Sequence, residues 1–220
     1  MHFAGVASLE QEFPGKDIVE THKICFIITV MPKLVDHEER RRSIASAAVD
    51  AIASEGLAAV KLTDIARAAG VTTGAVAHYF SGKDAVLAAA LDEVCTRLFA
   101  GIDAPDHALT LDAIAEVLPV TPEKRAEWRV WLAYWGRAPN VPALREIHQQ
   151  YYDEIETATA ETIAGRHPDP RRAAAAIIAA VDGIGVRVTL EPDLWPPERQ
   201  RALLETLVGP LLASIQPQTA

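Results

Sequence analysis

Hydrophobic residues recur along this chain with the spacing of helices rather than strands. From about residue 36 to the end, apolar positions lie three or four apart, and alanine, leucine, glutamate and arginine dominate. Apolar residues at that spacing form one face of an amphipathic helix, whereas a half-buried strand alternates every second residue. The dominant residue types also have high intrinsic helix propensity. The sequence therefore predicts an all-α fold.

The first part of this pattern predicts one long helix followed by two short ones. The long helix covers residues 36–55, and Gly56 follows it, as glycine commonly follows a helix. Thr63 is expected to cap a second helix that stops at Gly70. Thr72 is expected to cap a third helix that ends near Phe80. A longer fourth helix follows to about residue 100.

Prolines divide the rest of the chain into further predicted helices. They stand at the boundaries of the apolar periods, where helices tolerate proline. The predicted segments are 109–118, 122–138, 141–165, 170–190 and 196–214.

The two short helices around Gly70 have the arrangement of a helix-turn-helix, in which the second helix enters the major groove of DNA. Val76 and Phe80 are expected to point inward and fix that second helix. Thr63 and Thr72 place helix N-termini at the surface, where backbone amides attract phosphate. The outward positions of the second helix are Thr73, Gly74, Ala77 and His78, with Ala75 at the edge.

Two further side chains next to this helix are candidates for phosphate contact. Tyr79 carries a phenol, and Lys83 places a cation in the first turn of the fourth helix, where the helix dipole disfavours it. A phosphate beside the amine would offset that misfit. The same pattern of short helices also occurs in all-α proteins that bind no DNA, so spacing alone does not decide the function.

Overall charge and cysteine content exclude some classes of protein. The formal net charge of −9 weakens a nucleic-acid interpretation without excluding it, because the local surface decides phosphate binding. The two cysteines have no metal-ligand spacing, which predicts no metal site and fits a reducing, cytoplasmic setting. No apolar run approaches the roughly 20 residues that cross a bilayer. No catalytic or cofactor-binding motif occurs, so neither an enzyme nor a cofactor is expected.

A long stretch resembles a known family. The segment "RRRSIASAAVDAIASEGLAAVKLTDIARAAGVTTGAVAHYFSGKDAVLAAAL" (40–91) is similar to the N-terminal domain of TetR-family transcriptional regulators. The "HYF-x-x-K-D" variant resembles the choline-sensing, BetI-like branch. Many members of the family have a tyrosine two residues before the tyrosine of "YF", where this chain has Ala77. We therefore expect the helix to read the DNA bases through few direct contacts. The resemblance implies DNA contacts at Thr63, Thr72, Thr73, Gly74, His78, Tyr79 and Lys83.

The resemblance also implies a division of the chain. Residues 31–83 would form a three-helix DNA-binding domain, and residues 84–220 a helical domain for ligand binding and dimerisation. Residues 1–30 show no sustained period. They are open to three interpretations: a loosely attached or disordered arm, a short strand at 24–30, or a dispensable extension before Met31.

One groove-binding helix per chain implies two copies on a palindromic operator, and hence a two-fold homodimer. The family builds the dimer from its last two long helices. The residues expected at that interface are Ala173, Ala176, Ile177, Ala180, Val181, Ile184, Leu203, Leu204, Leu207 and Leu211.

Aromatic residues in the second half suggest a binding site for a small molecule. Each ring alone is explained by core packing, but together they would suit an apolar pocket, and a quaternary ammonium through cation–π contact. Asp182 is open to three interpretations: a solvated residue, a partner of Arg187, or a pocket carboxylate. The other candidates are Trp128, Trp131, Trp135, His148, Tyr151 and Tyr152.

Two functions remain in competition at this point. The first is a repressor that binds a palindromic operator as a homodimer and is released by a small-molecule effector of unknown identity. The second is an all-α small-molecule-binding protein or enzyme whose tryptophan-rich pocket is the functional site.

Overall fold

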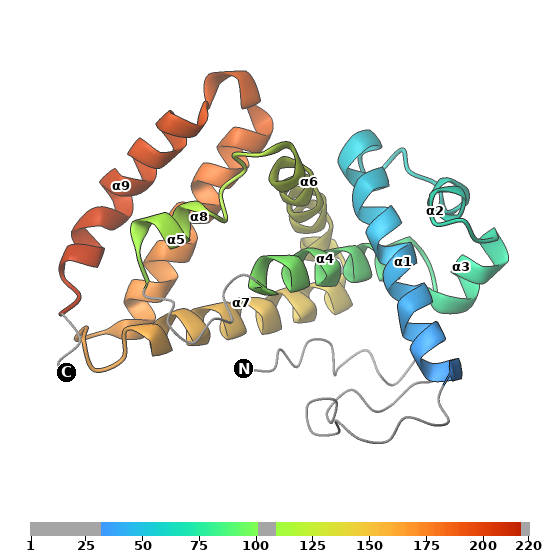
Figure 1. Cartoon of the computed structure of the whole chain (residues 1–220), viewed down its shortest axis with the longest axis horizontal. Coiled ribbons are helices and arrows are strands. Elements are labelled where there is room, and N and C mark those ends of the chain that lie inside the picture. Colours follow the sequence, from blue (N-terminus) through green and yellow to red (C-terminus); the bar gives the residue numbers. More distant parts are fainter. Residues whose placement is uncertain (1–31, 101–108, 217–220) are drawn as a thin grey trace. The chain divides into compact units, whose positions relative to one another are not determined.

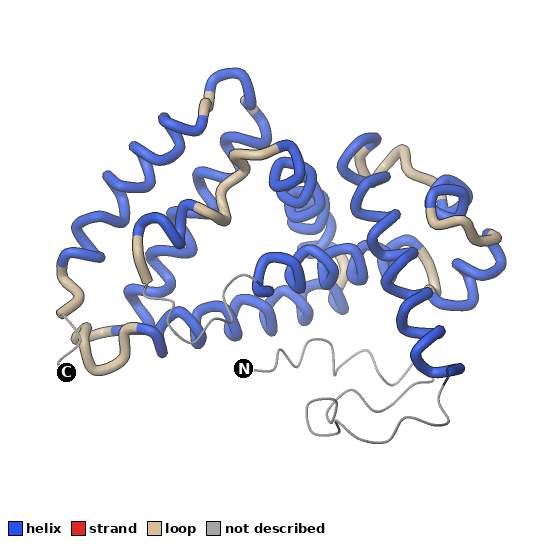
Figure 2. The backbone as a smooth tube through the Cα atoms, in the orientation of Figure 1, coloured by secondary structure: helices blue, strands red, loops and turns tan. Residues whose placement is uncertain are grey.

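The computed structural model describes residues 32–100 and 109–216, and these ranges consist of helices and loops without a strand (Figure 2). The predicted all-α class is confirmed. The proposed interpretations of residues 1–30 fall outside the described residues.

The chain divides into two compact units. Among the described residues, the first unit contains 32–96 and 133–150, and the second contains 97–132 and 151–216. The sequence prediction placed a functional boundary after residue 83. The first unit contains most of α4 (Lys83–Ala100), the end of α6 (Pro122–Arg137) and the start of α7 (Pro142–Thr162), and the functional boundary stays a prediction.

Three helices form the N-terminal part of the first unit: α1 (Pro32–Glu55), α2 (Leu62–Ala68) and α3 (Thr73–Tyr79) (Figure 1). Gly56 and Gly70 follow the first two with φ values of 78° and 66°, a backbone region in which glycine has no steric penalty. Thr72 caps α3 as expected, since its Oγ1 accepts the Ala75 N–H at 3.1 Å. The core of these helices includes Ile44, Ala48, Ile52, Ile65, Val76 and Phe80.

The cap predicted for the second helix is wrong. α2 begins at Leu62, so Thr63 lies inside its first turn, and Lys61 takes the N-cap position without a side-chain hydrogen bond. The apolar period of α2 already begins at the partly buried Leu62, so the helix starts one residue before Thr63.

A buried tyrosine joins two helices of the first unit. Tyr134, on α6, donates a hydrogen bond from its hydroxyl to the Leu144 carbonyl on α7. Burial raises the pKa of the Tyr134 hydroxyl well above its usual range, so it remains a donor. The short 3₁₀ helix η2 (Ala138–Asn140) connects the two α-helices at this point.

The second unit is built around α8 (Pro170–Leu190) and α9 (Pro197–Ala213), which lie side by side with α5 (Leu111–Ala115) against α9 (Figure 1). The predicted bounds of α8 match the structure. The core of this unit is formed by Ile114, Leu118, Ile177, Ile184, Val188, Leu204 and Val208.

The connection between α8 and α9 is held by a buried indole. The guanidinium carbons of Arg187 and Arg199 lie 4.7 and 4.2 Å from the centroid of the Trp195 ring. Trp195 donates its Nε1–H to Glu191 Oε2 at 3.1 Å, and Gln200 donates from Nε2 to the Trp195 carbonyl at 2.9 Å. These contacts lie on both sides of the short 3₁₀ helix η3 (Pro192–Leu194) and fix the turn of the hairpin.

By its length and composition alone, α8 could cross a membrane. The prediction that no apolar run approaches the length needed to cross a bilayer is therefore corrected for α8. The run was missed because alanine, which is only mildly apolar, makes up much of it. The core helix of a soluble protein can have the same length and composition, and α8 packs on α9 through Ile177, Ile184 and Val188.

Candidate functional site

The third helix presents a polar, small-residue face to solvent. Val76 and Phe80 are buried, as the sequence predicts, and lock the helix onto the core of the first unit. Ala75 and Tyr79 are partly exposed. The exposed positions are Thr72, Thr73, Gly74, Ala77 and His78.

Small side chains leave the backbone of this face accessible. A Cβ added at Gly74 would meet only the Thr72 Oγ1, at 3.8 Å, so the position faces open space. Any flat or grooved surface can therefore approach the α3 backbone closely. Thr63, although it does not cap α2, is also exposed.

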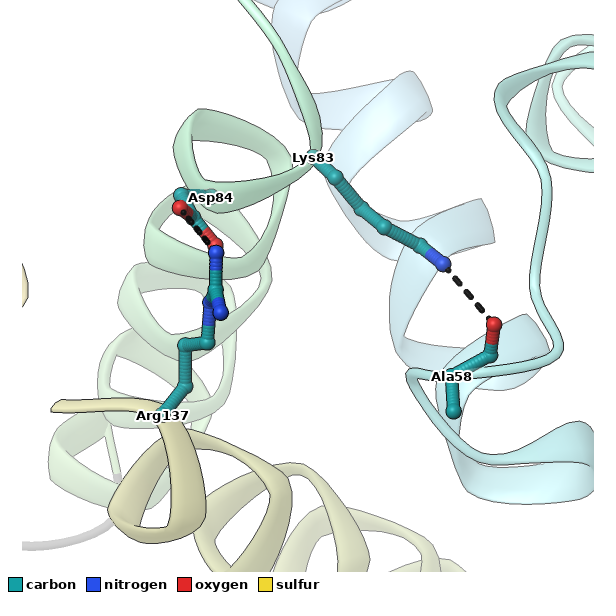
Figure 3. Close-up of polar contacts among 4 residues, drawn as sticks. All are labelled: Ala58, Lys83, Asp84 and Arg137. Atoms are coloured by element: carbon teal, nitrogen blue, oxygen red, sulfur yellow. Dashed lines mark hydrogen bonds and ion pairs between the residues drawn. The ribbon is translucent and has the colours of Figure 1, made fainter. Parts of the chain in front are cut away.

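Lys83 and Asp84 begin α4 and have partners on different elements (Figure 3). Lys83 Nζ donates to the Ala58 carbonyl at 3.2 Å, in the loop between α1 and α2. Asp84 accepts two hydrogen bonds from Arg137, from Nε to Oδ1 at 2.8 Å and from Nη2 to Oδ2 at 3.0 Å. The pKa of Arg137 is raised by these hydrogen bonds and by the charge of Asp84.

This arrangement places the Lys83 amine next to the helix-turn-helix. The helix dipole favours the Asp84 carboxylate at the start of α4 and disfavours the Lys83 cation beside it. Neither the Ala58 contact nor the Arg137–Asp84 pair was predicted, because residues 25 and 53 positions apart give no local pattern.

In the second unit, an aromatic pair leads to a partly buried carboxylate. The rings of Trp131 and Tyr152 meet edge to face with centroids 6.3 Å apart. Tyr152 donates its hydroxyl hydrogen to Asp182 Oδ2 at 2.7 Å. Burial raises the pKa of Asp182 to about 6, while the hydrogen bond from Tyr152 opposes that rise.

The proposed pairing of Asp182 with Arg187 is wrong. Arg187 pairs with Glu191 at 3.3 Å, one turn further along α8, and its guanidinium lies over Trp195. Asp182 faces the side of α8 that meets α7, where Tyr152 reaches it. The hydrogen bond from Tyr152 takes the place of the expected pairing with Arg187, and the role of Asp182 as a pocket carboxylate stays a prediction.

Trp128 is a packing residue. Its ring lies directly against the backbone of Gly185, since a Cβ added there would stand 2.0 Å from the indole carbons. Its Nε1–H donates to the Val117 carbonyl at 2.8 Å. The core interpretation therefore accounts for Trp128, and Gly185 is required by this approach rather than by its backbone angles.

The remaining aromatic candidates divide between the two units. Tyr151 is buried in the second unit, whereas Trp135 and His148 belong to the first. The His148 ring stacks near Tyr134 with centroids 6.5 Å apart, and burial lowers the pKa of His148. Within the predicted set, Trp131, Tyr152 and Asp182 form one continuous series of contacts in the second unit.

Sequence reasoning missed two further acids in the second unit. Burial raises the pKa of Glu127 on α6 and of Glu154 on α7. Glu127 lies four residues before Trp131, so both share one face of α6. The four-residue spacing of Glu127 and Trp131 was the sequence signal that could have revealed this acid. Among the described residues, no group of three or more histidines, cysteines or acids could hold a metal ion.

The predicted dimer residues also separate into two groups. Ala173, Ile177, Ile184 and Leu204 are buried inside the single chain, where they hold its own helices together, so their proposed contact with a partner is corrected. Apolar residues that recur every three or four positions predict a buried helix face, but the pattern does not identify the helix that covers it. The residues that stay exposed or partly exposed are Ala176, Ala180, Val181, Leu203, Leu207 and Leu211.

Comparisons with known proteins agree with this architecture. Residues 44–90 match the family model of bacterial regulatory proteins, tetR family. Residues 106–213 match that of the BetI-type transcriptional repressor, C-terminal. The chain belongs to the TetR family of transcriptional regulators. It is a regulator with a BetI-type C-terminal domain, and not an enzyme.

Individual relatives extend over most of this regulator. The transcriptional regulator BetI 2 of Chromohalobacter salexigens is 29% identical over 192 residues, which cover 83% of this chain and 93% of the relative. A transcriptional regulator from Rhodococcus sp. has a TM-score of 0.73 at 29% identity, covering 81% of this chain and 99% of that one.

One structural relative contains a small molecule. A regulator from Saccharomonospora viridis, solved in complex with choline, has a TM-score of 0.65 at 26% identity. The match covers 78% of this chain and 96% of that one.

Proposed function

We propose that this regulator is a repressor that binds a palindromic operator as a homodimer and is released by a small-molecule effector. The observation that carries the proposal is the exposed face of α3. Thr73, Gly74, Ala77 and His78 lie on this face, and buried residues anchor the helix to the core. TetR-family regulators are soluble DNA-binding proteins of the cytoplasm, and we place this one there.

DNA recognition would combine readout of the shape of the duplex with a small number of direct base contacts. Thr73 and His78 are the side chains on the exposed face that can reach base edges, and Ala77 suits a thymine methyl group. Tyr79 and Lys83 would contact phosphates, together with Thr63, Thr72 and Ala75 at the margins. Because this face lacks arginine, asparagine and glutamine, DNA shape supplies much of the specificity.

The dimer would form through the exposed apolar surface of α8 and α9. Leu207 on α9 has 52% of its surface exposed, and Leu190 at the end of α8 has 65%. We expect these leucines to belong to one contiguous apolar patch, which is the kind of surface that binds a protein partner. A second copy of the chain is the partner that a palindromic operator requires.

The effector would be an organic cation of the quaternary ammonium class. Trp131 and Tyr152 offer aromatic faces and edges, and Asp182 offers a negative charge above a pH of about 6. The relative with bound choline supports the same chemistry. Hydrogen bonding by Tyr152 keeps the carboxylate oriented, so a cation would gain both charge and ring contacts.

Transmission to the DNA-binding helices would use α6. This helix carries Trp131 in one unit and ends at Arg137, which is paired with Asp84 at the start of α4. Lys83 immediately precedes Asp84, so a shift of α6 would move the proposed phosphate contact of Lys83. An effector acts through this route only if it binds one conformation better than the other.

Recovery of bound duplexes from a genomic DNA pool tests the proposal. A repressor selects palindromes near a limited number of genes, and choline or a related quaternary ammonium lowers recovery. Recovery of random sequence at every salt concentration would contradict it. An all-α small-molecule-binding protein, the competing interpretation, would recover no duplex.

A further inference from the structure

An aromatic contact joins the start of α1 to the end of the recognition helix. The His37 ring lies 4.5 Å from the Tyr79 ring, measured between centroids, with an interplanar angle of 52°. It lies 6.3 Å from the His78 ring at 75°, and the rings of His78 and Tyr79 are 5.5 Å apart. These rings form one surface group, which we call the 37–78–79 cluster.

The same face of α1 makes a second contact one turn later. The guanidinium of Arg41 lies over the Phe80 ring at 5.7 Å. Residues 37 and 41 are four apart and therefore share a helix face, and Ile44 and Ala48 continue it into the core with no exposed surface. His37 thus extends the buried stripe of α1 to the edge of the α3 surface.

His37 has no evident role in the core, because its own side chain is exposed. Its ring nevertheless covers part of the Tyr79 ring, which is partly buried. A tyrosine at the end of a short helix can otherwise turn between rotamers, and ordering it on DNA binding costs free energy. A ring held beside it beforehand lowers that cost.

We propose that His37 is a positioning residue that holds the Tyr79 ring so that its hydroxyl meets a DNA phosphate. The inference rests on the proposed DNA-binding function and adds a residue of α1 to it. His37 acts through Tyr79 and makes no base contact. Removal of an aromatic pair of this kind would change the affinity for DNA about three- to tenfold.

A double-mutant cycle on an operator duplex tests the inference. Fluorescence anisotropy with the wild type, His37→Ala, Tyr79→Phe and the double variant measures each affinity at several salt concentrations. We expect His37→Ala to weaken binding about three- to tenfold in the wild-type background. In the Tyr79→Phe background, which lacks the hydroxyl, it should cause no further loss.

Two more variants separate positioning from other roles. His37→Phe keeps a ring but no hydrogen-bond donor, and should bind as tightly as the wild type with the same salt slope. Ser43→Ala, at an exposed position on the same helix, should change nothing. Circular dichroism before each titration confirms that every variant is folded.

The inference is overturned if His37→Ala costs the same in both backgrounds, if His37→Phe fails to restore binding, or if Tyr79→Phe leaves affinity unchanged. Lys83→Ala in the same titration reports on the proposed function independently. Loss of affinity in Lys83→Ala with no effect at His37 would reject only the positioning role. A wild type that binds no duplex would reject both.

Discussion

The Tyr152 hydroxyl and the Asp182 carboxylate are joined by a 2.7 Å hydrogen bond between α7 and α8. Burial raises the pKa of Asp182 to about 6 in spite of this bond. The Asp182 carboxyl group is therefore costly to ionise without a cation beside it, which is the property expected of a counter-ion for a bound ammonium.

Asp182→Asn should stabilise the protein in the absence of effector above a pH of about 6. The ordinary pKa of this carboxyl is 3.8, so folding favours its protonated form, and stability falls as pH rises from 3.8 through about 6. The amide still accepts from Tyr152 but carries no charge. Thermal unfolding at pH 8 should show a gain of about 1–3 kcal/mol that disappears near pH 4.

Asp153→Asn provides the matched control for that measurement. Asp153 lies on α7 and pairs with Arg171 at 3.4 Å, with most of its side chain exposed. Its removal should change stability little, since exposed ion pairs contribute about 0–1 kcal/mol. A pH-independent effect of Asp182→Asn would contradict the assignment of a buried charge.

The same carboxylate should make effector affinity depend on pH. Choline binding, measured by isothermal titration calorimetry, should be weaker at pH 5 than at pH 8, because protonation of Asp182 removes the negative charge. Asp182→Asn should weaken it at least about tenfold and abolish the pH dependence. Equal affinity at both pH values would show that Asp182 does not face the ligand.

Gly185→Ala should be strongly destabilising, because the added methyl group would stand 2.0 Å from the Trp128 ring. Overpacking of this kind costs about 1–3 kcal/mol or more. Gly183→Ala, two residues earlier on the same helix, meets nothing within 4 Å and should gain about 0.5–1 kcal/mol from helix propensity. Denaturant unfolding of the two variants separates these effects, and similar stabilities would contradict the packing of Trp128.

Arg137→Gln should weaken effector response without weakening the fold. The Arg137 and Asp84 side chains are 50% and 38% exposed, so their pair contributes at most about 1 kcal/mol to stability. Operator affinity without effector should stay within about threefold of wild type, whereas release by effector should require more ligand. Asp84→Asn should reproduce this phenotype. Normal release in both variants would remove the pair from the transmission route.

The fold was largely predictable because it follows from local patterns. Helical periodicity, glycine positions and the Thr72 cap are properties of neighbouring residues, and the structure confirms them. The site was predictable only in part. Tyr152 meets Asp182, and Arg137 meets Asp84, across long sequence separations that leave no periodic signal. Burial of Ile177 and Leu204 within one chain likewise depends on which helix covers them, which the apolar stripe alone does not specify.

The most direct test of the account is a titration of the recovered palindromic duplex against the same duplex with one half scrambled, with stoichiometry measured by analytical ultracentrifugation. The account predicts two chains on the intact palindrome, much weaker binding to the half-scrambled duplex, and affinity that falls steeply as salt rises. A single chain bound equally to both duplexes, with little effect of salt, would contradict it.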